Sequence, residues 1–97
     1  MGDDLSILFD RIGTLLDRPP AASASSTDEV EHTLTDGYAR ALALEGDRLR
    51  TEERIKELAG SAEHVPELRA LKRRLGALDR ELDELRALLR VLASTIR

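Results

Sequence analysis

The chain has 97 residues, of which 35% are charged and 2% are aromatic, and its formal net charge is −4. This length allows one small domain, and a composition dominated by Leu, Arg, Ala, Glu and Asp is typical of long helices and coiled coils rather than of an aromatic-rich core. The absence of cysteine excludes disulfides and thiolate metal sites. The net negative charge argues against a general attraction to nucleic acid or anionic lipid.

Residues 1–18 are expected to form a short amphipathic helix. Asp3 or Asp4 suits its N-cap, where a carboxylate is favourable, and Pro19 ends it because proline donates no amide hydrogen. A helix of this length is marginal alone, so its apolar face has to pack against another surface. That face comprises Leu5, Leu8, Phe9, Ile12, Leu15 and Leu16.

Residues 19–27 are predicted to be a flexible linker, since their small side chains bury too little to offset the entropy of ordering. The remaining residues, 28–97, are predicted to form an antiparallel helical hairpin. Gly60 suits the end of its first helix and Pro66 suits the first turn of its second helix. We expect a helix at 28–59, a turn at 60–66 and a helix at 67–96.

The hairpin is predicted from two matching seams of apolar residues. Leucine and isoleucine recur at steps of three and four from Leu68 to Ile96, which is the a/d spacing of a coiled coil. A weaker seam runs through residues 30–58, and one antiparallel register aligns the two seams along their length, with Leu44 facing Leu82. The first helix is acidic and the second is basic, which also favours the fold-back. The predicted fold is therefore an all-α coiled-coil hairpin with a short N-terminal helix.

Five further apolar side chains lie off this seam. A two-helix hairpin buries little, so either the N-terminal helix or a second protomer has to cover them. Two hairpins that pair into a homodimeric four-helix bundle would do so, and C2 dimers are the commonest assembly. The predicted interface consists of Tyr38, Leu42, Leu49, Leu88 and Val91, together with Leu5, Leu8, Phe9, Ile12 and Leu16.

Polar residues interrupt the seam at the middle of the hairpin, where Arg48 and Thr51 occupy seam positions. One interpretation is a polar pocket or partner-binding notch, in which Arg48 and Thr51 face a small anion, a nucleotide or an acidic side chain. A buried polar residue can also simply fix the register and oligomeric state. The interpretation we favour is that Arg48 lays its methylene groups over the seam and pairs with Glu45 or Glu52. The candidate ligand zone comprises Arg48, Thr51, Glu45, Glu52, Arg73 and Arg74.

The sequence gives little support for a metal site, a nucleic-acid site or a catalytic site. Glu29 and His32 have the Glu-x-x-His spacing of di-iron bundles, but such a site needs a second copy and further inward carboxylates, so we expect no metal. The basic cluster at residues 69–74 has no interleaved aromatic residue, so nucleic acid is not an expected partner. No catalytic residue or cofactor is predicted.

The sequence thus predicts a non-catalytic interaction or regulatory module that works through helix–helix contacts. Its expected partner is a second copy, another helical protein, or both. The alternative is a ligand-responsive regulator that binds an anion or nucleotide at the polar middle of the hairpin. No apolar run approaches the ~20 residues of a membrane span, and an acidic N-terminus does not suit a secretory signal, so a cytoplasmic protein is expected.

Overall fold

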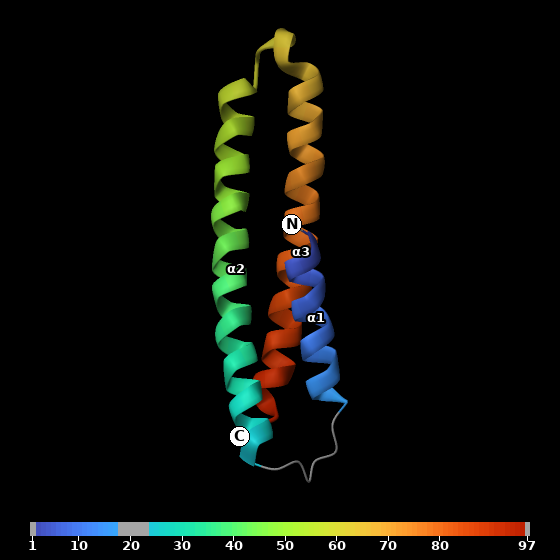
Figure 1. Cartoon of the computed structure of the whole chain (residues 1–97). Helices are drawn as coiled ribbons and strands as arrows, with labels where there is room; N and C mark the ends of the chain where they lie inside the picture. The colour runs from blue at the N-terminus through green and yellow to red at the C-terminus, as the bar shows by residue number, and fades with distance from the viewer. Residues whose placement is uncertain (1, 18–23, 97) are drawn as a thin grey trace.

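The computed structural model of the chain is a rod of helices, with principal extents of 60 × 18 × 17 Å (Figure 1). It describes residues 2–17 and 24–96, and the side chains of residues 5–17 and 27–96. That part of the chain contains no strand, so the predicted all-α class is confirmed. The elements in order are α1 (Gly2–Leu16), α2 (Ala24–Leu58), the short 3-10 helix η1 (Ala62–His64) and α3 (Val65–Ser94).

The start of α2 differs most from the predicted boundaries. The helix begins at Ala24, inside the predicted linker of residues 19–27, and not at residue 28. Alanine is the strongest helix former, and residues 24–27 contain no glycine or proline, so nothing in them opposes extension of the helix toward the N-terminus. The rest of the predicted linker, residues 19–23, lies outside the described residues.

The connection between α2 and α3 uses a glycine and a proline. Gly60 follows the end of α2 with φ +93°, a left-handed conformation that favours glycine because it has no Cβ. Pro66 lies in the first turn of α3, where an amide hydrogen has no partner inside the helix anyway. Because α3 already begins at Val65, the turn is shorter than the predicted residues 60–66.

The two long helices lie side by side and antiparallel, and their facing side chains form most of the core (Figure 1). Gly37 allows a close approach of α2 to α3, because a Cβ at this position would overlap the side chain of Leu89. Arg48 on α2 reaches Asp79 on α3, whereas the later Arg54 reaches the earlier Glu67, so the two helices run in opposite directions. The buried apolar residues of these helices are Val30, Leu34, Ala41, Leu44, Leu58, Leu78, Leu82, Leu85, Leu89 and Leu92.

The short helix α1 covers only one end of this pair. It packs against the N-terminal half of α2 and the C-terminal half of α3 (Figure 1). Leu5, Leu8 and Ile12 are buried and belong to the same apolar cluster as Leu85. The rod therefore has two parts, a three-helix segment (residues 5–17, 30–45 and 78–92) and a two-helix segment (residues 46–77).

The position of α1 corrects the predicted interface. Leu5, Leu8 and Ile12 are buried against the chain's own core, and Phe9, Leu16 and Leu88 are partly buried against the same core. The apolar face of α1 is thus used within the fold, because it fills the groove between α2 and α3. The four remaining residues of the predicted interface stay exposed, namely Tyr38, Leu42, Leu49 and Val91.

Candidate functional site

Three large apolar side chains form an exposed stripe along α2. Tyr38, Leu42 and Leu49 keep 54%, 69% and 57% of their surface accessible. At about 100° per residue, their positions fall within roughly 40° of one another on the helical wheel. They therefore form one continuous surface rather than three scattered exposed residues. We call this surface, together with the intervening Ala39 and Gly46, the α2 outer face.

The small residues give the α2 outer face its shape. Ala39 lies one turn before Leu42, and Gly46 lies one turn after it and three residues before Leu49. A Cβ added at Gly46 would contact the guanidinium of Arg50 at 3.4 Å, so this flexible side chain is what partly covers the backbone there. The leucines project from the helix, and the small residues Ala39 and Gly46 lie between them. Alternating large and small side chains of this kind pack well against another helix.

The α2 outer face points away from α1. Thr33 and Arg40, which line hollows beside α1, lie on the opposite side of the α2 helical wheel from Tyr38. Leu34 and Leu44, which belong to the buried core, lie between these two sides. No helix described in the structure covers the α2 outer face. The sequence left two candidates to cover these three residues, the N-terminal helix and a second protomer. The position of α1 removes the first candidate.

The polar middle of the hairpin is an ion-pair network. Arg48 donates from its Nε to Asp79 on α3, and its terminal nitrogen lies 3.2 Å from Glu52. The hydrogen bond and charge of Asp79, followed by the charge of Glu52, raise the pKa of Arg48 above its ordinary value. The guanidinium is about half exposed and already has two carboxylate partners. The pairing of Arg48 with Glu52 is one of the two pairings expected from the sequence, and Asp79 is an additional partner.

A second arginine joins the helices nearer the turn. Arg54 of α2 donates to Glu57 at 3.1 Å and to Glu67 of α3 at 3.2 Å. The hydrogen bonds to Glu57 and Glu67 raise the pKa of Arg54. On the other side of Arg48, Glu45 accepts a hydrogen bond from Arg86. Ion pairs therefore join α2 and α3 at three levels, all with exposed or half-exposed partners.

The other members of the predicted ligand zone do not converge with Arg48. Thr51 is buried, and its hydroxyl donates to the carbonyl oxygen of Asp47 in its own helix at 2.8 Å. Arg73 is exposed on α3. Arg74 lines a hollow beside α1 that neither Arg48 nor Glu52 lines. The structure thus joins Arg48 and Glu52 and separates them from Arg74.

The hollow that Arg74 lines encloses about 480 Å³ where α1 meets the middle of the hairpin. Arg40 also lines it, and the Nε of Arg40 is buried without a hydrogen-bond partner among the described residues. Three carboxylates, Asp10, Asp47 and Glu81, line the same hollow. They outnumber the two arginines, which opposes the binding of an anion there.

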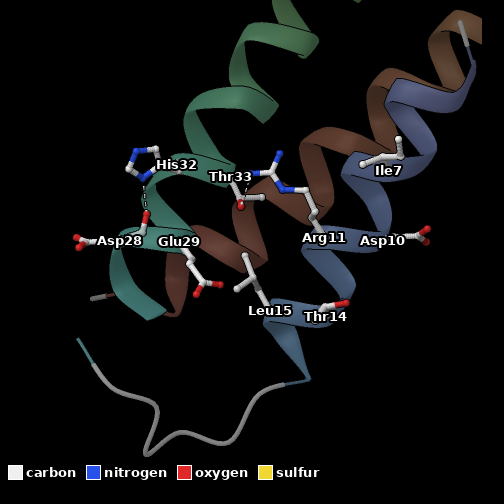
Figure 2. Close-up of a pocket in the computed structure, with 9 residues that line it drawn as sticks. All are labelled: Ile7, Asp10, Arg11, Thr14, Leu15, Asp28, Glu29, His32 and Thr33. Carbon is white, nitrogen blue, oxygen red and sulfur yellow. Dashed lines mark hydrogen bonds between the residues drawn. The ribbon is translucent and has the colours of Figure 1, made fainter. Parts of the chain in front are cut away.

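A larger hollow of about 690 Å³ lies between α1 and the start of α2 (Figure 2). Arg11 of α1 crosses it and donates to Thr33 at 3.1 Å and to Asp36 at 3.0 Å, so it ties α1 to α2. His32 lies on the side of α2 away from α1, where its Nδ1 is 2.8 Å from the carbonyl oxygen of Asp28 (Figure 2). Arg11 is a residue that the sequence analysis missed, because nothing in the sequence specifies which groove α1 fills.

Two general findings bear on function. Among the described residues, no group of three or more histidine and carboxylate side chains is placed to hold a metal ion, and Glu29 and His32 are part of no such group. Over the same residues, no helix combines the length and apolar character needed to cross a bilayer.

Comparison with family models, with curated proteins and with solved structures finds no match for this chain. Its function therefore has to be argued from its own surface.

Proposed function

We propose that the protein is a non-catalytic interaction module whose α2 outer face binds a helical partner. The supporting observation is the stripe of Tyr38, Leu42 and Leu49, three large apolar side chains left exposed on one face of a helix that is otherwise strongly charged. Scattered exposed leucines are ordinary on protein surfaces, whereas an aligned group between charged residues is typical of an interaction site.

The free energy gained by burying these three side chains is consistent with packing against a second helix. Fully burying a leucine side chain stabilises a complex by about 1.5–3 kcal/mol, and these side chains still expose more than half of their area. A partner helix that covers the stripe therefore gains about 1–2 kcal/mol per side chain. The partner in this proposal is a second copy, another amphipathic helix, or both, packed by knobs into holes. With α1 on the other side of the hairpin, a homodimer of two hairpins would form through the α2 outer face.

The second candidate function is the binding of a small anion or nucleotide. It is favoured by Arg40, whose buried Nε has no partner among the described residues, and by Arg74 in the same hollow. The three carboxylates of that hollow weigh against it. Thermal melting in the presence of phosphate, pyrophosphate and nucleotides tests this candidate. A rise in melting temperature that Arg74→Ala removes and Arg69→Ala preserves would support it, and unchanged melting with every ligand would remove it.

The interaction proposal is tested by photo-crosslinking in the cells that make the protein. A photoreactive amino acid at position 42, on the α2 outer face, is expected to give a discrete adduct, and Leu49→Glu should abolish that adduct. The same reactive group at Lys72, an exposed position on α3, is the matched control and should give no such adduct. If position 42 yields no discrete adduct, the proposal is wrong.

A further inference from the structure

We propose that the occupant of the α2 outer face is the same face of a second copy, packed antiparallel about a two-fold axis near residue 44. This inference rests on the proposed function and names its partner. A two-fold interface requires a surface that is complementary to itself, so that each contact occurs twice. The α2 outer face meets this requirement in shape and in charge.

The complementarity in shape pairs large residues with small ones. With the axis beside residue 44, Leu42 of one copy faces Gly46 of the other, and Leu49 faces Ala39. Each leucine thus meets a position with little or no side chain. Only the guanidinium of Arg50 lies beside Gly46, and this flexible group can turn aside to make room for a leucine from a second copy. The same arrangement lets the two helices approach closely along four contacts.

The complementarity in charge comes from residues that flank the stripe. Farther from the axis, Lys56 of one copy lies within one residue of the level of Glu31 of the other, so a cation meets an anion at each end.

The helices that the structure describes do not compete for this face. Arg11 ties α1 to Thr33 and Asp36 on another side of α2, and the buried leucines of α1 hold it there. The contact uses one face of one helix from each copy, which is small compared with the roughly 800 Å² per partner of a stable complex. A reversible dimer that dissociates on dilution follows from this size.

Light scattering of the purified full-length chain across concentration tests the proposal. The wild-type mass is expected to rise from 10.8 kDa toward twice that value. Leu42→Glu should remain a monomer at every concentration. Val91→Glu is the matched control, because Val91 is an apolar residue with 51% of its surface exposed on α3, and it should dimerise like the wild type. Both positions are exposed, so circular dichroism should show both variants folded.

Disulfide trapping tests the register, and the chain has no native cysteine to interfere. When Leu42→Cys and Gly46→Cys chains are mixed in a redox buffer, the mixed disulfide should form in excess over both homodimeric disulfides. An excess of the 42–42 disulfide would overturn the proposed axis.

A wild-type chain that stays monomeric at all concentrations, or a Val91→Glu chain that loses dimerisation together with Leu42→Glu, overturns the second copy as partner. These failures are distinguishable from failure of the proposed function. With either failure, a discrete adduct from position 42 with a different protein would keep the interaction function, whereas the absence of any adduct would remove the function as well.

Discussion

The three-helix and two-helix segments share the same two long helices but bury them to different extents. In the three-helix segment, Leu85 and Leu92 lose all contact with solvent because α1 covers the side that α2 does not reach. In the two-helix segment, Leu68, Leu71 and Leu75 remain partly accessible although their spacing is equally regular. The difference shows that a regular seam does not by itself make a core, because two helices leave the flanks of their contact open to water.

The largest expected difference between the segments concerns truncation of the seam. Leu85→Ala should lower the free energy of unfolding by about 2–5 kcal/mol, because it leaves a cavity surrounded by three helices. Leu71→Ala makes the same change in the same helix at a partly exposed position, so we expect about 1–2 kcal/mol. Urea denaturation followed by circular dichroism measures both, and equal losses would mean that the two segments do not differ in packing.

Substitution of Gly37 and of Gly76 by alanine should change the stability of the chain in opposite directions. A Cβ at Gly37 overlaps the side chain of Leu89, so Gly37→Ala should destabilise the three-helix segment by about 1–3 kcal/mol although alanine favours helix. At Gly76 a Cβ meets only the flexible end of Arg80, at 3.7 Å, so Gly76→Ala should stabilise the chain by up to about 1 kcal/mol. Thermal melting of both variants checks the signs, and a stabilising Gly37→Ala would contradict the close contact of α2 with α3.

The attachment of α1 should be weakened by a single polar substitution. Arg11→Gln removes the bonds to Asp36 and to Thr33, whose hydroxyl is almost fully buried, and should cost about 1–2 kcal/mol. The loss should appear as faster amide exchange in α1 and in the first turns of α2. Exchange between residues 50 and 75 should stay unchanged, and acceleration there would show that the segments open as one unit.

The smallest effect is expected at the Arg48–Asp79 ion pair, which joins α2 and α3 where the two segments meet. Asp79→Asn leaves the half-exposed Arg48 with Glu52 as a partner, so the cost should be about 0–1 kcal/mol and should shrink as salt is added. Denaturation midpoints at low and high salt measure it. A larger cost that does not depend on salt would contradict the solvent-exposed position of this network.

Much of the helical content could be predicted from the sequence. The spacing of leucines from Leu68 to Ile96 indicates one long helix, and Gly60 and Pro66 mark the connection before it. The helix α2 begins four residues earlier than the sequence predicts, because small residues that are typical of a linker also continue a helix readily. Helix propensity alone does not distinguish a linker from the first turn of a helix when neither glycine nor proline is present.

The site was harder to predict than the helices. An apolar face shows that α1 must pack, but not in which groove, so the sequence did not separate Leu5 and Ile12 from Leu42 and Leu49 as interface candidates. A strict heptad predicts a seam position for Arg48, whereas a helix of 3.6 residues per turn drifts away from that repeat. At the edge of the contact its guanidinium reaches Asp79 and solvent.

The chain contains an intrinsic fluorescent probe of whether a partner copy covers the α2 outer face. Tyr38 is the only tyrosine of the chain, which has no tryptophan, and it lies on that face. Acrylamide quenching of its fluorescence should be measured from dilute to concentrated protein, with Leu42→Glu as the reference. We predict that quenching falls with concentration in the wild type and stays at the dilute value in Leu42→Glu. Equal quenching at all concentrations in both proteins would show that Tyr38 always faces solvent, which would contradict self-association through α2.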